Sequence, residues 1–297
     1  MPGFSFNRRD FLQHAAALAS MNAVTARAAG KPRFRMGLQM YTVRDPMARD
    51  ALGTLRQIAA LGYRNLETYG FDPDTLKYYG MPASDFRKVL EDLGLTTTSG
   101  HYDLHAYLAR PAESMAAYID RCIQGAQALN QRYITWAWLD PQSRGLESFR
   151  LVAQRLNSIG AQAAKGGLSV AYHNHDFEFV PHEGGAIGYD ILLRETDPQL
   201  VKLQIDLFWV AHSSQRTPHE LFKLQPGRFV MWHVKDMDSQ KRYTELGHGS
   251  IDFTRIMPDA QLAGLEEYFV EQGDNFAVSP MKSIETSAHY VRQHLDR

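Results

Sequence analysis

The sequence predicts an α/β protein that folds as one (β/α)8 barrel. Short runs of β-branched and aromatic residues alternate with longer segments of helical periodicity from Phe34 onward. Eight such runs fit the 297-residue chain, which is close to the roughly 250 residues typical of this barrel. The first run lacks the glycine-rich turn that a doubly wound nucleotide-binding sheet usually carries there.

The expected elements follow one another along a single domain at 30–297, without an internal linker. The expected strands are 35–42, 65–69, 96–102, 133–139, 168–175, 201–208, 229–235 and 267–271. The expected helices are 48–61, 83–93, 112–129, 146–165, 189–195, 218–224 and 281–295. Most strands are thus followed by a helix, which is the order that a parallel barrel requires.

Composition excludes several classes of protein. The chain has 32 Lys and Arg against 33 Asp and Glu, which argues against nucleic acid as a partner, because phosphate binding usually needs a basic excess. Its 44% hydrophobic content is enough for a folded core. The single cysteine, Cys122, cannot form an internal disulfide. No apolar run reaches the roughly 18 residues of a membrane span.

Residues 1–29 differ from the rest of the chain. Arg8 and Arg9 precede Phe11-Leu12 and a short stretch of small apolar residues that ends near Ala26-Arg27-Ala28. This pattern resembles a twin-arginine export signal with a cleavage site. We therefore expect cleavage, passage through the twin-arginine translocase and a periplasmic mature protein. The alternative is an amphipathic first helix of the folded domain.

Four late strands end in side chains that bind metals. They are His173, Asp206, His233 and Glu271, each at the end of a mostly apolar run. Carboxyl ends of barrel strands meet at one mouth, where catalytic groups gather. Burying four such groups there would be costly without a cation. We expect one divalent metal ion, either Mn, Co, Zn, Fe, Ni or Mg. Taken singly, each residue could equally be a hydrogen-bonded surface group.

Further candidates lie near other strand ends. His175 shares the face of His173 by the period of two, and Lys235 shares that of His233. Weaker candidates are Glu67 and His101 as substrate-facing groups, and Trp138, Trp209 and His248 as substrate contacts. Trp136 and Trp138 are expected on one face of the fourth strand, where aromatic rings stack on sugars or simply fill the core. No nucleophile elbow or Walker loop is present.

With these motifs assembled, the chain resembles the xylose-isomerase-like TIM-barrel superfamily, the sugar phosphate isomerase/epimerase group. The resemblance covers the chain from the first to the eighth strand. Its more specific pieces are Tyr-His-Asn-His-Asp-Phe-Glu-Phe (172–179), Ile-Asp-Leu-Phe-Trp (205–209), His-Val-Lys-Asp (233–236) and Gly-His-Gly-Ser-Ile-Asp-Phe (247–253). It implies that the four strand-end residues bind the metal and that the substrate is a carbohydrate.

The sequence departs from many sugar epimerases of this group at His173, where they have a glutamate. In those enzymes, two glutamates exchange the proton on opposite faces of the substrate. The His-x-His at 173–175 looks more like the branch with dehydratase or lyase activity on keto-sugars and keto-inositols. An expected base removes the proton next to a metal-bound carbonyl: His175 is the first choice, then His101 and Glu67, with Lys235 as a donor.

The expected substrate is a free sugar or glycoside, because sugar phosphates are scarce outside the cytoplasm. The expected enzyme removes a proton next to a metal-bound carbonyl, and return of that proton would make it a sugar isomerase or epimerase. Loss of a β-substituent would instead make it a lyase or dehydratase, and a 3-keto-glycoside undergoing β-elimination fits both the metal and the compartment. Two alternatives stay open. One is a periplasmic sugar-binding barrel without turnover, and the other is a metal phosphodiesterase of the abasic-site endonuclease type, which would need three clustered metals.

Overall fold

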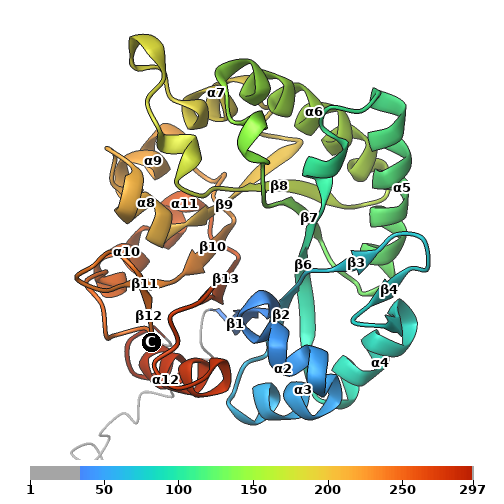
Figure 1. Cartoon of the computed structure of the whole chain (residues 1–297), viewed down its shortest axis with the longest axis vertical. Helices are drawn as coiled ribbons and strands as arrows, with labels where there is room; N and C mark the ends of the chain where they lie inside the picture. The colour runs from blue at the N-terminus through green and yellow to red at the C-terminus, as the bar shows by residue number, and fades with distance from the viewer. Residues whose placement is uncertain (1–33, 296–297) are drawn as a thin grey trace, which may run out of the picture. The chain divides into compact units, whose positions relative to one another are not determined.

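Eight parallel strands close into a barrel at the centre of the fold (Figure 1). A computed structural model describes residues 34–295, so the predicted signal at 1–29 lies outside the described part. The barrel strands are β1 (Met36–Gln39), β2 (Asn65–Thr68), β6 (Thr96–Tyr102), β7 (Tyr133–Trp136), β8 (Ser169–His173), β9 (Val201–Asp206), β10 (Met231–Val234) and β13 (Glu267–Val270). Each expected strand has its counterpart, and the predicted barrel in a single domain is confirmed.

The barrel closes through pairing of β1 with β13, where Met36 lies opposite Tyr268. Asp206 pairs with His233 and Gln39 pairs with Glu67, whereas His173 pairs with Gln204, two residues before Asp206. Polar residues near the ends of strands far apart in sequence therefore reach the same end of the barrel, as the carboxyl ends of parallel strands do.

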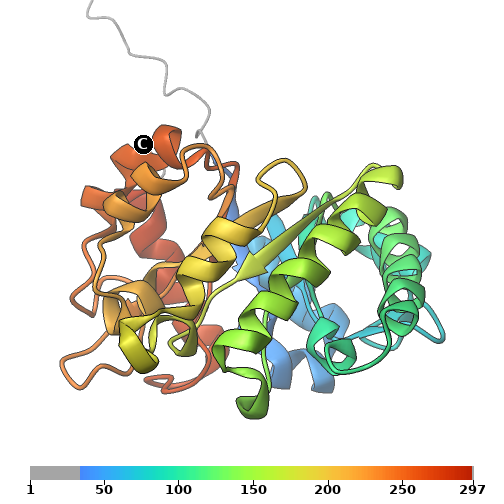
Figure 2. The same ribbon diagram turned by 90° about the horizontal axis from the view of Figure 1, so that it is seen from above.

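An outer layer of helices surrounds the barrel (Figures 1 and 2). The main helices are α2 (Arg44–Arg49), α3 (Ala51–Ala60), α4 (Ala83–Asp92), α5 (Ala112–Ala128), α6 (Leu146–Lys165), α7 (Gly188–Glu195), α9 (Pro218–Leu224) and α12 (Pro280–His294). The helix expected at 48–61 is interrupted, because Asp50 leaves the helical conformation and its carboxylate accepts a hydrogen bond from the Gly53 amide at 2.9 Å. Asp50 thus caps a new helix, as an N-cap residue does.

Most barrel strands end earlier than expected, and the early ends of β7 and β8 place two predicted site residues beyond their strands. β7 ends at Trp136, which is fully buried, whereas Trp138 lies beyond the strand and is 41% exposed. The expectation that these two tryptophans share a strand face is therefore wrong, since alternation applies only within a strand. β8 ends at His173, so His175 also lies just past its strand.

A helix replaces the predicted end of the sixth barrel strand. α8 (Leu207–Ser213) begins directly after Asp206. The Asp206 Oδ1 atom accepts hydrogen bonds from the amides of Phe208 at 2.9 Å and Trp209 at 3.3 Å. The carboxylate satisfies amides at the start of this helix, so it acts as an N-cap.

Short elements that the sequence pattern did not predict decorate the loops. A three-stranded antiparallel sheet follows β2, formed by β3 (Phe71–Asp72), β4 (Lys77–Tyr78) and β5 (Met81–Pro82). A two-stranded sheet follows β10, formed by β11 (Asp236–Met237) and β12 (Tyr243–Thr244). Two four-residue helices, α10 (Phe253–Ile256) and α11 (Ala260–Ala263), precede β13. These elements are too short to show a hydrophobic period.

An apolar floor lies beneath the strand ends. Ala171, Met231 and Phe269 are buried in one small cluster, and each lies two residues before a predicted metal ligand. Residues two apart on a strand share a face, so these three side chains point into the barrel beneath the polar ones. Within residues 34–295, no helix combines the length and apolar character required to cross a bilayer.

Candidate active site

The structure brings together four predicted metal-binding side chains from four neighbouring strands. The ligand atoms of His173, Asp206, His233 and Glu271 all lie within 4.8 Å of one another, and all four residues are buried. The sequence alone predicted this set from strand-end positions. Imidazole and carboxylate donors at such spacing form a set that could hold a divalent transition metal.

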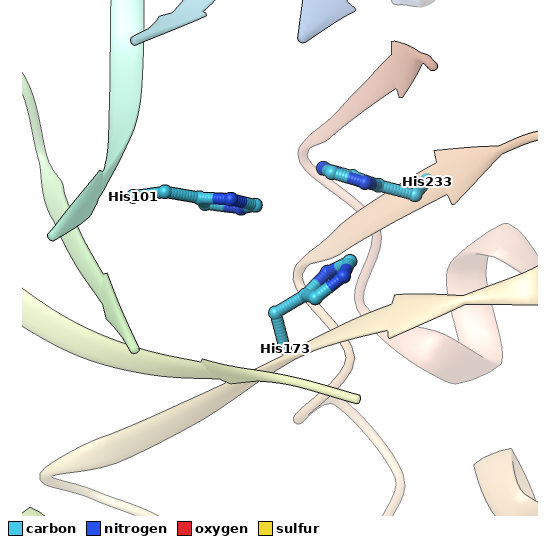
Figure 3. Close-up of side chains that lie close together, drawn as sticks. All are labelled: His101, His173 and His233. Atoms are coloured by element: carbon cyan, nitrogen blue, oxygen red, sulfur yellow. The ribbon is translucent and has the colours of Figure 1, made fainter. Parts of the chain in front are cut away.

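A second group of donor atoms overlaps the first. His101, at the end of β6, lies with His173 and His233 so that one ring atom of each falls within 4.8 Å of the others. Figure 3 shows the three rings converging from different strands. The His101 and His233 rings are nearly parallel, with centroids 5.4 Å apart. His101 is therefore part of the same polar cluster, which it joins through His173 and His233.

Lys235 supplies a positive charge inside the four-residue set. Its Nζ atom lies 2.7 Å from Asp206 Oδ2 and 2.6 Å from Glu271 Oε2, and the side chain is buried. Burial lowers the pKa of this ammonium, but the two carboxylates raise it further than burial lowers it. Lys235 consequently stays charged and interacts with the carboxylates that would also face a metal ion.

Glu67 is a buried hub beneath the cluster rather than a cavity-facing base. It is fully buried, and its carboxylate accepts hydrogen bonds from Gln39 Nε2 at 2.7 Å, Gln204 Nε2 at 2.6 Å and His233 Nε2 at 2.5 Å. Its Oε2 atom also lies 3.1 Å from His101 Nε2. Burial alone would raise the pKa of Glu67, but the two histidines hold it well below its usual value. Glu67 therefore orients two histidines.

Gln204, which the sequence analysis missed, determines the tautomer of His101. The Gln204 amide nitrogen donates to Glu67, so its Oε1 atom is the acceptor that lies 2.8 Å from His101 Nε2. His101 must then carry a proton on Nε2, which leaves Nδ1 as its acceptor atom when the ring is neutral. The period of two was the available signal, because Gln204 precedes Asp206 by two residues on one strand.

His233 faces a carboxylate on each ring nitrogen. Its Nδ1 atom lies 2.9 Å from Glu271 Oε2, and its Nε2 atom donates to Glu67. Burial would lower the pKa of His233, but Glu67 and Glu271 raise it to about 9. A carboxylate hydrogen-bonded to one nitrogen fixes the imidazole and strengthens the other nitrogen as a ligand.

His173 and His175 are the less basic histidines of the site. Burial, together with the neighbouring His233, holds the pKa of His173 well below its usual value, and its Nδ1 atom has no hydrogen-bond partner among residues 34–295. His175 lies among the rings of Trp138, Phe177 and Trp209. Burial and Lys235 lower its pKa in the same direction. Both rings are therefore neutral at neutral pH, the form that can accept a proton or bind a metal.

Glu178 holds the segment that carries His175. Its carboxyl group accepts hydrogen bonds from the Tyr172 hydroxyl at 2.7 Å and from the His175 amide at 2.8 Å. Burial raises the pKa of Glu178 to about 8. This carboxyl is therefore largely neutral at pH 7 and positions the loop after β8.

A cavity of about 810 Å³ opens above the cluster. Its lining includes His101, His173, His175, Lys235 and Glu271, together with Trp138 and Trp209. Both predicted substrate-contacting tryptophans thus reach the cavity. His248 does not line this cavity and instead lines a separate hollow beside α12. The loop that carries it is held by Asp236, which accepts the Gly247 and Gly249 amides.

The charges around the cluster fit a divalent cation. Three buried carboxylates, Glu67, Asp206 and Glu271, face a single buried ammonium, that of Lys235. Because the pKa of His233 is raised to about 9, this ring is protonated at neutral pH, and the cluster then carries one uncompensated negative charge. Binding of a metal to the His233 ring would release that proton and leave two negative charges for the cation to balance. The Nε2 atom of His173 lies 3.8 Å from Asp206 Oδ2 and adds a nitrogen donor to the set. The donor set and its charge therefore suit a bound metal.

Comparisons with known proteins agree with this architecture. A sugar phosphate isomerase/epimerase from Parabacteroides distasonis is 27% identical, with a TM-score of 0.77 over 92% of this chain and 97% of that one. A xylose isomerase-like TIM barrel protein from Mycobacterium smegmatis, solved in complex with magnesium, is 16% identical, with a TM-score of 0.65 over 89% of this chain and 97% of that one.

Two curated relatives are inosose dehydratases. The protein of Geobacillus thermodenitrificans is 26% identical over 50% of this chain and 55% of its own length. That of Lactiplantibacillus plantarum is 27% identical over 48% of this chain and 53% of its own length. The chain thus spans about half the length of the curated relatives it matches. The model of one family, described as xylose isomerase-like TIM barrel, matches residues 55–293. The chain therefore belongs to the xylose isomerase-like TIM barrel family.

Proposed function

We propose that this protein is a divalent-metal-dependent lyase that eliminates a β-substituent from a keto-sugar or keto-glycoside. The observation that carries the proposal is the pairing of a four-residue donor set with neutral, cavity-facing histidines. A metal bound by His173, Asp206, His233 and Glu271 would polarise the carbonyl of the substrate and stabilise the charge left by deprotonation.

The residues around the donor set have separate roles in this proposal. His101, held by Gln204 and Glu67 as the Nε2-protonated tautomer, offers Nδ1 to a proton on the carbon next to the carbonyl. The ring centre of His175 lies 4.9 Å from that of His173, and His175 is the other candidate base. Lys235 is the proton donor nearest to the two ligand carboxylates.

The elimination balances without another reactant. The C–H proton goes to the histidine base, a C=C bond forms, and the C–O bond to the leaving group breaks. The departing oxygen takes one proton, so the products are an unsaturated keto-sugar and water or an alcohol. Elimination is favoured over two-base epimerisation because His173 lies at the strand end where many sugar epimerases have one of their two glutamates. The two inosose dehydratase relatives support the same class of reaction.

The test is incubation of purified protein with a 3-keto-glucoside and either Mn²⁺ or Co²⁺ in deuterated water. We expect release of the aglycone, with the metal-ligand variant Asp206→Asn inactive as the control. Deuterium entry without release, or with inversion, would indicate an epimerase or isomerase, as in the Parabacteroides neighbour. Neither release nor exchange with any metal would contradict the proposal and favour a sugar-binding barrel.

Export of the protein is part of the proposal. The arginine pair at Arg8-Arg9 supports passage through the twin-arginine route to the periplasm. Replacing both arginines with lysine in a strain that expresses the full chain should retain the protein in the cytoplasm. Periplasmic recovery of the double variant at the level of the unmodified chain would contradict this route.

A further inference from the structure

Two exposed aromatic rings line the cavity at separate places. Among the described residues, the exposed large hydrophobic side chains include two aromatic ones, Tyr41 at 44% and Trp138 at 41%. Both belong to the cavity lining. An aromatic ring exposed inside a cavity is a surface that a ligand with an apolar face can cover.

Each ring is fixed in position although it is exposed. The Arg44 guanidinium lies 4.3 Å from the Tyr41 ring centre and donates a hydrogen bond to the Tyr41 carbonyl. Tyr69 packs edge-on against Tyr41 at 5.4 Å. The Arg144 guanidinium lies 4.7 Å from the Trp138 ring centre. These contacts restrict both rings before any ligand binds, which lowers the entropic cost of binding.

The two rings follow strands that are not neighbours in the barrel. Tyr41 follows β1 and Trp138 follows β7, and the order of the closed barrel places β2 and β6 between them on one side. His101, from the end of β6, lines the cavity between these two positions. One ring faces the His175 side of the site, whereas the other is on the side of β1 and β2.

We propose that Tyr41, with Arg44 over one face of its ring and Tyr69 packed against it in a T-shaped contact, forms a second subsite for the leaving unit of a glycoside. The unit is a second ring with an apolar face, either a sugar or an aryl aglycone, while the first ring binds beside Trp138. This inference rests on the proposed function for the identity of the leaving unit. The volume of 810 Å³ supports it, because cavities of about 300–1,000 Å³ hold ligands larger than one sugar ring.

Binding to unreactive glycosides tests the subsite without turnover. Calorimetry would compare methyl β-glucoside, which has one ring, with cellobiose and phenyl β-glucoside, which have two and lack the keto group. We expect the two-ring ligands to bind about 2- to 10-fold more tightly, as one aromatic contact predicts. A larger gain for cellobiose would identify a sugar as the second ring, and one for phenyl glucoside an aryl group.

Variants of Tyr41 and Trp138 show which ring is responsible for the tighter binding of the two-ring ligands. Tyr41→Ala should abolish the two-ring advantage and leave the affinity for methyl glucoside unchanged, whereas Tyr41→Phe, which keeps the ring, should preserve the advantage. Trp138→Ala should weaken all three ligands. Equal affinities in the unmodified protein, no binding at all, or an advantage that survives Tyr41→Ala would overturn the subsite. Turnover of methyl 3-keto-glucoside in the same preparation would show separately whether the proposed reaction stands.

Discussion

Replacing Glu67 with glutamine should weaken metal binding without removing a ligand. The carboxylate receives hydrogen bonds from Gln39 and His233 on Oε2, where His101 also points, and from Gln204 on Oε1. A glutamine amide offers only one acceptor oxygen. In one orientation the new NH2 group faces the NH2 group of Gln204. In the other it faces the N–H groups of Gln39 and His233.

The magnitude follows from the donors left without partners. At least two buried N–H groups, one on the new amide and one on a neighbour, lose their acceptor, and each costs about 1–3 kcal/mol. We therefore expect Glu67→Gln to lower the free energy of unfolding by about 2–6 kcal/mol. Because His233 loses its carboxylate partner, metal affinity should fall about 10- to 100-fold, as for other groups that orient a ligating histidine.

Calorimetric titration with Mn²⁺ or Zn²⁺ and urea unfolding would measure the two effects. Glu245→Gln is the matched control, because Glu245 is also buried and accepts hydrogen bonds, but from Ala277 and Ser283. The control should lose stability and keep its metal affinity. The reasoning fails if Glu67→Gln binds metal as tightly as the unmodified protein, or if Glu245→Gln weakens binding equally.

Three other predictions concern neighbouring groups. The pKa of Glu178 is raised from 4.5 to about 8, so the folded protein keeps a proton that the unfolded chain releases. The contribution of this proton to stability is complete below pH 4.5 and is lost as the pH rises to 8, by at most about 1.4 kcal/mol per pH unit. Glu178→Gln should remove this pH dependence. The same change of melting temperature from pH 5 to pH 8 in the variant and in the unmodified protein would contradict the prediction. Lys235→Met should raise metal affinity at least about tenfold, because a nearby ammonium opposes the ion; unchanged or weaker binding by calorimetry would refute this. Gln204→Leu should remove one of the two acceptors of the His101 Nε2–H group and so raise the Nδ1-protonated fraction of this ring; an unaltered ¹⁵N spectrum of the ring would exclude the assigned role.

Local periodicity was sufficient to predict the barrel and part of the site. The strand ends at His173, Asp206 and His233 follow from apolar runs that stop abruptly at an ionisable residue, and the parallel order of the strands brings such ends together. Gln204 is two residues before Asp206 and so lies on the same face of the strand, but a neutral amide in an apolar strand does not by itself indicate a functional site.

Other features depend on contacts between distant segments. Glu67 has the same sequence pattern as a cavity-facing residue, and only the packing of Gln39, Gln204 and His233 around it makes it a buried hub. Trp138 reaches the cavity because its strand ends two residues earlier. His248 lies beside α12 because Asp236 holds its loop there.

The order of strands and helices, and the residue types at the strand ends, can be predicted from local patterns, because the periods of two and 3.6 are local properties of the chain. Which side chains are in contact, which are buried and which face the cavity depends on how the whole barrel folds. Closure of the barrel and the paths of its loops bring together residues more than two hundred positions apart, and no local pattern encodes which of them meet.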